Sequence, residues 1–133
     1  MFQGIYTPIV TPFHKNEEID YDKLKHNLEK LGKSKLSGIV VLGSNGEFAY
    51  LNYEEKLQLV KFVIQNFTKE KKIIVGTYNE STRETIKFSK EVAKLGVDAI
   101  LVLPSNYYKS AMKEDILYRY FTDIADESPI PMM

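Results

Sequence analysis

Apolar runs of strand length alternate along this chain with stretches of helical periodicity, and this alternation restricts the fold more than any other feature. Three of the runs are continuously apolar, which is typical of strands that are buried on both faces of a sheet. Regular alternation of strands and helices predicts a parallel sheet with right-handed crossovers, and therefore an α/β fold. The four runs are Gly4–Val10, Gly38–Leu42, Ile73–Val75 and Ala99–Leu103.

The stretches between the runs carry helix-end signals as well as apolar side chains at helical spacing. Asn52 with Glu55, and Ser81 with Glu84, are capping-box patterns that predict the starts of the second and third helices. Gly96 predicts the end of the third helix, because glycine readily adopts the left-handed conformation that often follows a last turn. The first helix is indicated by three leucines spaced i, i+4 and i+7, namely Leu24, Leu28 and Leu31.

The last part of the chain predicts one more helix and the beginning of one more strand. A helix is expected over Lys113–Ala125, and Ser128–Met133 is expected to open a fifth strand. A doubly wound open sheet and a (β/α)8 TIM barrel both fit this order, and periodicity does not choose between them. No linker, low-complexity tract or second domain is indicated. The side chains expected on the inner face of the last helix are Ile116, Leu117, Tyr120 and Ile124.

Composition matters here mainly for the classes of function that it excludes. Of the 133 residues 44% are apolar, as in ordinary soluble domains, and eighteen basic residues balance eighteen acidic ones. No global field therefore attracts nucleic acid or an anionic membrane. The absence of cysteine excludes disulfides and thiolate sites, and it fits a reducing compartment. Because the sequence has neither a signal-peptide pattern nor an apolar run near the roughly 18 residues of a membrane span, we expect a soluble cytoplasmic protein.

A glycine-flanked polar loop follows the second predicted strand. In Gly43-Ser44-Asn45-Gly46-Glu47, backbone N–H groups and two small polar side chains can converge on an anion. The loop is not a P-loop, because no Gly-Lys-Ser/Thr follows it, and it is not a dinucleotide fingerprint, because the spacing of its glycines is wrong. The residues alone leave two interpretations open, a carboxylate or phosphate cradle and a plain strand-to-helix turn. For Glu47 a structural hydrogen-bond acceptor is favoured over a general base.

Polar and aromatic segments also follow the third and fourth predicted strands. Tyr107 and Tyr108 can relay a proton, pack against a partner subunit, or simply cover the mouth of a barrel. Gly76–Thr82 is polar and is expected to line the same mouth, with Ser81 explained as a helix cap. Lys109 is the one lysine near the carboxyl end of a predicted strand, and an exposed loop lysine is favoured there over a Schiff-base lysine, since a nucleophilic amine must be desolvated.

The remaining titratable residues give weak signals. His14 and His26 do not form a metal constellation, and no metal is expected. Lys71 and Lys72 precede their strand, at the end opposite to a site in parallel α/β folds, and are interpreted as solvated charge.

Three segments, in matching order and spacing, resemble the dihydrodipicolinate synthase / N-acetylneuraminate lyase family. They are Gly4–Phe13, which is similar to its first-strand segment, Gly43–Glu47, similar to its Gly-Thr-Thr-Gly-Glu loop, and Pro104–Tyr108, similar to its Pro-Tyr-Tyr segment. The resemblance runs from residue 2 to the end of the chain. Within the family it is closest to the 4-hydroxy-2-oxoglutarate aldolases, which share Ser-Asn in the loop. The stretch between Pro104 and the tyrosine pair is one residue longer than is usual in the family.

The resemblance implies a TIM barrel in which a lysine forms a Schiff base with pyruvate or another 2-oxo acid, with no further cofactor. It implies that Ser44 and Asn45 hold the substrate carboxylate, that Ser44 also passes protons, and that Tyr107 reaches across an interface into a neighbouring site. A homo-oligomer, dimer or tetramer, is therefore expected.

By the same resemblance, residues 1–133 are the N-terminal half of a class I aldolase barrel of roughly 250 residues, truncated at the start of strand five. The implied fifth-strand tyrosine and sixth-strand lysine fall after Met133. Two alternatives are a dihydrodipicolinate synthase that condenses aspartate semialdehyde with pyruvate, and a non-catalytic half-barrel.

Overall fold

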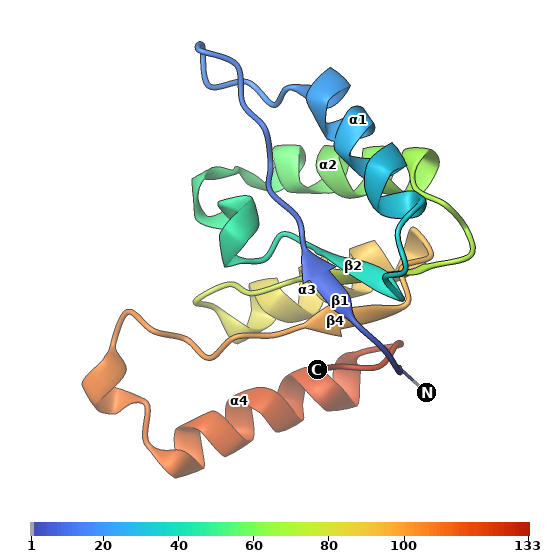
Figure 1. Cartoon of the computed structure of the whole chain (residues 1–133). Coiled ribbons are helices and arrows are strands. Elements are labelled where there is room, and N and C mark those ends of the chain that lie inside the picture. Colours follow the sequence, from blue (N-terminus) through green and yellow to red (C-terminus); the bar gives the residue numbers. More distant parts are fainter. Residues whose placement is uncertain (1) are drawn as a thin grey trace. The chain divides into compact units, whose positions relative to one another are not determined.

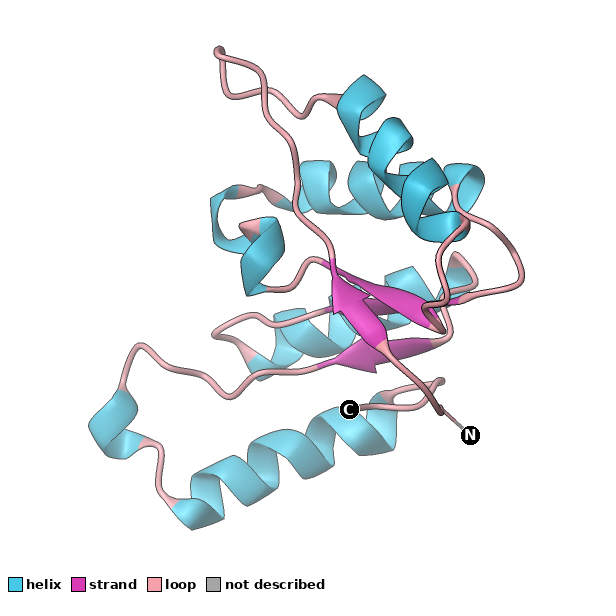
Figure 2. Cartoon of the chain, viewed as in Figure 1, coloured by secondary structure: helices cyan, strands magenta, loops and turns pink. Residues whose placement is uncertain are grey.

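Strands and helices alternate along the chain in the predicted order (Figure 1). The computed structural model describes residues 2–133. It divides into two compact units, Met1–Ile74 and Val75–Met133, with the boundary inside the third strand. Figure 2 shows the strands and helices by type. The strands are β1 (Tyr6–Pro8), β2 (Gly38–Val41), β3 (Lys72–Gly76) and β4 (Ala99–Leu101), and the α-helices are α1 (Tyr21–Gly32), α2 (Tyr53–Asn66), α3 (Thr82–Lys94) and α4 (Glu114–Glu127).

In the first unit, β1 pairs in parallel with β2, with Tyr6 opposite Gly38. The N–H of Lys72, at the start of β3, donates to the carbonyl of Ser37 at 3.1 Å. A Cβ on Gly38 would lie 2.3 Å from the Lys72 carbonyl, so only glycine allows the strands to approach this closely. The core of the unit is apolar and is formed by Leu24, Leu28, Ile39, Val41, Leu59, Val60 and Val63.

Helix starts in the first unit follow the sequence closely. The capping box at the start of α2 is confirmed, because Asn52 accepts from the Glu55 N–H at 2.9 Å and Glu55 accepts from the Asn52 N–H at 2.8 Å. At the start of α1, the buried Asp20 accepts from the Lys23 N–H at 3.0 Å. The Lys23 ammonium lies 2.8 Å from the same carboxylate, and hydrogen bonding to Lys23 lowers the pKa of Asp20.

The interpretation of Lys71 as solvated charge is wrong. Its half-buried ammonium donates to the carbonyls of Leu31 at 2.9 Å and Ser34 at 2.6 Å, at the C-terminal end of α1. The last carbonyls of a helix have no partner within the helix, so a cation there is favourable. These partners lie 37 and 40 positions away in the sequence, and only folding brings them together. Lys72 is exposed, as expected.

In the second unit, the chain leaves β3 and returns through α3 to β4, and α3 packs against α4. The N–H of Thr77 donates to the carbonyl of Leu101 at 3.1 Å. Thr77 itself is buried, and its hydroxyl accepts from the buried Ser89 hydroxyl at 2.9 Å. The apolar core of this unit includes Val75, Phe88, Val92, Val97, Ile100 and Ile124.

The predicted opening of a fifth strand is confirmed within the second unit. Met132 forms a parallel bridge with Ile100. The Ile100 N–H donates to the Pro131 carbonyl at 3.0 Å, and the Met133 N–H donates to the Ile100 carbonyl at 2.9 Å. The segment Pro131–Met133 therefore runs beside β4 in the same direction, joined to it by an isolated parallel bridge.

Two local predictions in the second unit are only partly right. At Ser81 the hydroxyl accepts from the Glu84 N–H at 3.4 Å, which is one half of the predicted capping box. On α4, Tyr120 and Ile124 are buried as predicted, whereas Ile116 is 45% exposed. Gly96 has φ of 92° directly after the α3 cap, as predicted for a glycine that ends a helix.

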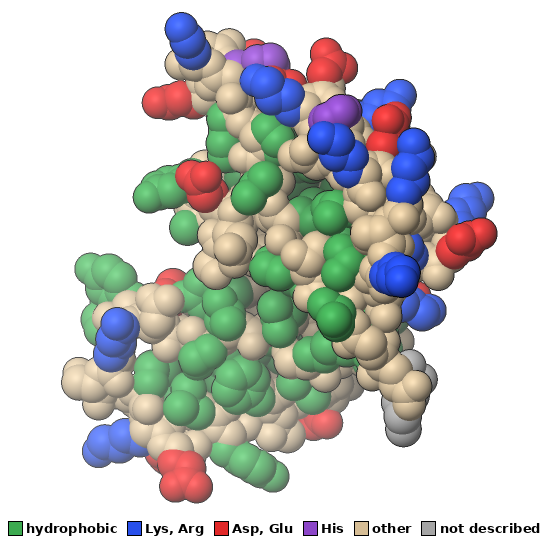
Figure 3. Space-filling view, in the orientation of Figure 1, with side chains coloured by type: hydrophobic (Ala, Val, Ile, Leu, Met, Phe, Trp, Pro, Cys, Tyr) green, Lys and Arg blue, Asp and Glu red, His purple; other side chains and the backbone are tan. Residues whose placement is uncertain are grey.

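Large apolar side chains also reach the surface of each unit (Figure 3). In the first unit Ile5 and Val10, on either side of β1, are more than half exposed. In the second unit the exposed side chains include Tyr107, Tyr108 and Ile116. Exposed apolar side chains that gather in patches mark surfaces that contact other chain segments or other proteins.

Candidate active-site loops

The polar loop predicted after the second strand lies at the carboxyl end of β2. Ser44, Asn45 and Gly46 form one turn of 3₁₀ helix, η1. Two non-glycine residues in the left-handed region bracket the turn, Leu42 with φ of 57° and Glu47 with φ of 53°. Each such residue costs on the order of 1–2 kcal/mol, which the surrounding packing must supply. Leu42 supplies part of that packing, because its side chain is buried.

A buried hydrogen bond holds the loop against the segment that follows β1. The Thr11 hydroxyl donates to the Gly46 carbonyl at 2.7 Å, and Thr11 is 5% exposed. A Cβ on Gly46 would lie 3.0 Å from the Ile9 carbonyl, so the loop backbone sits close to its neighbour. The side chains of Ser44 and Asn45 are exposed, and among residues 2–133 neither has a hydrogen-bond partner. A hydroxyl and an amide are thus presented at a strand end by a fixed backbone.

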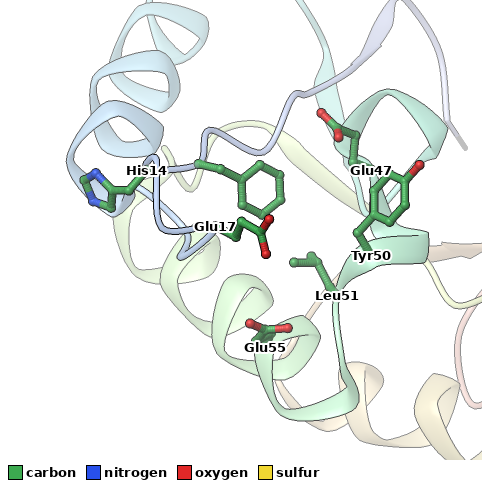
Figure 4. A pocket seen from close by; sticks show the side chains of 7 residues that line it. His14, Glu17, Glu47, Tyr50, Leu51 and Glu55 are labelled. Carbon is green, nitrogen blue, oxygen red and sulfur yellow. The ribbon is translucent and has the colours of Figure 1, made fainter.

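A cleft of about 420 Å³ lies in the same unit, but its chemistry differs from that of the loop (Figure 4). Three carboxylates line it, together with Phe13, His14, Tyr50 and Leu51. One of the three, Glu55, is engaged in the capping box of α2. Over the described part of the chain, no group of acidic and histidine side chains is arranged to hold a metal ion. Because carboxylates repel an anionic ligand, this cleft is not a carboxylate cradle.

Glu47 lines the cleft, and among the described residues its side chain does not stabilise the loop by a hydrogen bond. Its backbone N–H donates to the Ser44 carbonyl at 3.1 Å, but within residues 2–133 its exposed carboxylate has no hydrogen-bond partner. The predicted role of this side chain as a structural acceptor is therefore not observed.

In the second unit, the tyrosine pair lies in the loop between β4 and α4. Tyr107 and Tyr108 are 77% and 67% exposed, with ring centroids 4.9 Å apart and planes at 80°. The ring of Tyr107 thus lies outside the core of its own unit, and its role at an interface stays a prediction.

Lys109 is exposed, as expected of a loop lysine. Burial instead lowers the pKa of Lys56 on α2, whose ammonium lies 5.6 Å from the ring centroid of Phe48.

Glu80, in the loop after β3, is the residue that sequence reasoning missed. Its carboxylate accepts from the hydroxyls of Tyr78 and Ser105, and from the N–H groups of Asn106 at 3.2 Å and Tyr107 at 3.3 Å. These bonds, with the Ser105 hydroxyl foremost, lower the pKa of Glu80. The pKa of Tyr78 is raised, chiefly by desolvation and then by Glu80. An acidic residue within a polar strand-end loop was the only sequence signal for this role.

The buried Tyr120 of α4 joins the loop after β3 to the loop after β4 at positions close to the strands. Its hydroxyl lies 3.2 Å from the Leu103 carbonyl and 3.3 Å from the Asn79 carbonyl, and burial raises its pKa. The loops after β3 and β4 are therefore joined at their base by a buried hydroxyl and at their outer side by Glu80.

The sequence matches the model of the dihydrodipicolinate synthetase family over residues 1–133. The chain belongs to this family. Among curated family members, it is 36% identical to a 4-hydroxy-tetrahydrodipicolinate synthase of Oceanobacillus iheyensis, over 99% of this chain and 44% of that protein. It is 40% identical to a probable mitochondrial 4-hydroxy-2-oxoglutarate aldolase of Emericella nidulans, over 98% of this chain and 43% of that protein. This family chain thus spans less than half the length of the relatives it matches.

The solved structures of the family have the same architecture. The chloride-inhibited dihydrodipicolinate synthase of Acinetobacter baumannii, solved in complex with pyruvate, matches with a TM-score of 0.93 and 32% identity, over 99% of this chain and 45% of that one. The predicted α/β fold is confirmed: the chain corresponds to about the first half of the (β/α)8 barrel of this family. Among the described residues, no helix has the length and apolarity that crossing a membrane requires.

Proposed function

We propose that this chain supplies the N-terminal half of a class I aldolase or lyase that acts on pyruvate or another 2-oxo acid. The observation that carries the proposal is the loop after β2, where Ser44 and Asn45 stand exposed at a strand end on a backbone held by Thr11. Sites in TIM barrels lie at the carboxyl ends of the strands. The pyruvate complex of the Acinetobacter baumannii relative supports the substrate class.

The two side chains suit a carboxylate in different ways. Asn45 carries an amide NH₂ that donates without a formal charge, and the Ser44 hydroxyl can donate and accept. We assign both to binding the substrate carboxylate, and Ser44 also to passing a proton during the reaction. Because neither side chain is committed to a bond within residues 2–133, binding requires no internal bond to break.

The covalent step belongs to a lysine that the family resemblance implies on a sixth strand. Its amine attacks the 2-oxo carbon, water leaves, and the resulting imine accepts the electron pair released when the C–C bond breaks. The described residues, 2–133, hold four strands and the opening of a fifth, so the proposed activity needs the remaining strands of a barrel. We assign Tyr107 to a neighbouring subunit's site in a cytoplasmic dimer or tetramer, which its exposed ring supports.

For the exact substrate we favour 4-hydroxy-2-oxoglutarate. The 40% identity to the Emericella nidulans protein supports this choice. A dihydrodipicolinate synthase is the second candidate, supported by the 36% identity to the Oceanobacillus iheyensis enzyme.

The experiment that tests the proposal is a pyruvate titration of the ¹⁵N-labelled chain, followed by NMR. We expect pyruvate, but not the neutral acetone, to shift the amide signals of residues 43–46, and Ser44→Ala and Asn45→Ala to weaken this response. Ser110→Ala, an exposed serine of the other unit, is the matched control. If the loop signals do not move with pyruvate, the assignment of the loop as the carboxylate site fails, and the non-catalytic half-barrel is favoured.

A further inference from the structure

We propose that Glu80 is a positioning residue that fixes the backbone under Tyr107 by binding the segment Ser105–Tyr107 with its carboxylate. The hydrogen bonds from Ser105, Asn106 and Tyr107 to the Glu80 carboxylate, called the clamp below, are a property of this chain. Its functional consequence rests on the proposed function, in which Tyr107 acts at a neighbouring site.

The two carboxylate oxygens of Glu80 accept hydrogen bonds from different sets of donors. Oε2 accepts from the Ser105 hydroxyl and from the N–H groups of Asn106 and Tyr107, three successive residues of the loop. Oε1 accepts from the Tyr78 hydroxyl and, at 3.4 Å, also from the Asn106 N–H. Both oxygens therefore contact the loop, and Tyr78 further restricts the rotation of the carboxylate.

The Glu80 bonds decide where the Tyr107 ring is presented. That ring is exposed and meets the ring of Tyr108 edge-on, so the protein core does not determine its direction. Its direction follows from the backbone at Asn106 and Tyr107, and both of these amides are held by Glu80. Tyr120 fixes the loop only further back, at Leu103. Without Glu80, the part of the loop that carries the ring loses these anchors.

The clamp requires the ionised carboxylate. An ionised carboxylate only accepts hydrogen bonds, whereas a protonated one gains a donor and loses acceptor capacity. Three other titratable side chains line the same shallow cleft as Glu80, all from α4: Arg119, Tyr120 and Asp123. Arg119 is directed to Asp123, with 3.7 Å between Nε and the carboxylate, which leaves Glu80 to the loop.

The decisive measurement is a pH titration of the ¹⁵N-labelled chain, read at the amide protons of Asn106 and Tyr107. Amide protons bound to a carboxylate shift when that carboxylate titrates. We expect both signals to move together with a midpoint below the ordinary glutamate value of 4.5, since the clamp lowers the pKa of Glu80. Signals that stay constant through the titration of Glu80 would overturn the proposal.

Glu80→Gln keeps the shape of the side chain but replaces one acceptor oxygen with a donor NH₂ that faces other donors. We expect it to abolish the shared titration, to speed hydrogen exchange at the two amides by about tenfold, and to remove the contacts between the rings of Tyr107 and Tyr108. Glu84→Gln, which removes a nearby charge from α3, is the matched control and should change none of these. If Glu80→Gln behaves like Glu84→Gln, the clamp does not exist.

The pyruvate response of residues 43–46, measured on the same samples, reports on the proposed function separately. Loss of that response with an intact Glu80 titration rejects the proposed function and leaves the clamp standing. The reverse result rejects the clamp alone.

Discussion

The hydroxyl of Thr11 donates a buried hydrogen bond of 2.7 Å to the carbonyl of Gly46, across 35 positions of sequence. This bond joins the segment after β1 to the loop after β2, and so sets the backbone from which Ser44 and Asn45 project. The loop also contains two non-glycine residues with positive φ, Leu42 and Glu47, which on their own would favour another conformation. Thr11 therefore stabilises a loop conformation that the backbone preferences of Leu42 and Glu47 alone would not favour.

Replacing Thr11 with valine should reduce the free energy of unfolding by about 1–3 kcal/mol, because it leaves the buried Gly46 carbonyl without its donor. Valine has nearly the same shape, so the packing is retained. Thr11→Ser keeps the hydroxyl and should recover most of the bond energy. Urea denaturation of the three proteins measures the difference, and equal stability of the valine and threonine forms would refute the role given to Thr11.

The buried Asp20 makes stability depend on pH on the acid side. Because hydrogen bonding to Lys23, and to a lesser extent the charges of His14 and Lys23, lower its folded-state pKa, the carboxylate contributes stability above the ordinary value of 3.8. That contribution should be lost as the pH falls from 3.8 through the lowered folded-state value. Thermal unfolding followed between pH 6 and pH 2 should show a smaller acid loss in Asp20→Asn, which still caps α1. An identical pH profile in the two proteins would contradict the prediction.

Lys71→Met should destabilise the first unit by about 1–2 kcal/mol, since it removes the cation from the C-terminal carbonyls of α1. The methionine stem preserves most of the apolar contact of the lysine side chain. Lys69→Met, at an exposed position, is the control and should be nearly neutral. Chemical denaturation measures both, and equal effects at the two positions would mean that the Lys71 bonds contribute nothing specific.

The 133-residue chain by itself should form no stable imine with pyruvate. Imine formation requires an unprotonated amine in a desolvated position, and Lys109 is exposed. Among the lysines, burial lowers the pKa of Lys56, so Lys56, and not Lys109, is the first position at which to look for an adduct. Borohydride reduction with pyruvate, read by intact mass, tests this directly. A stoichiometric adduct on any lysine would overturn the prediction.

If Tyr107 lies at an interface between copies, Tyr107→Ala should weaken self-association by about tenfold or more, as expected of a buried aromatic anchor. Tyr118→Ala is a suitable control, because Tyr118 is similarly exposed at 73%. Sedimentation velocity over a range of concentrations distinguishes the variants. Purely monomeric behaviour of the unaltered chain at all concentrations would remove the support for this role in residues 1–133.

The sequence by itself determined the features that depend on neighbouring residues. The Asn52–Glu55 capping box and the glycine end of α3 at Gly96 followed directly from local pattern, since the atoms involved lie within a few positions of each other. The strands were predicted from their apolar runs, although their pairing joins distant residues such as Tyr6 and Gly38. The position of Ser44 and Asn45 at a strand end was also predictable, because residues that directly follow a strand in the sequence lie at its carboxyl end.

Only the tertiary structure decided the contacts that join distant segments. Lys71 is bound to the end of α1 from 37 and 40 positions away, and Glu80 holds a loop 25 to 27 positions further along the chain. With a different packing of the strands, the same residue types would be solvated charges, as the sequence alone predicts for Lys71. The role of a charged side chain depends on which hydrogen-bonding groups the fold brings within about 3 Å of it, and no local sequence pattern contains that information.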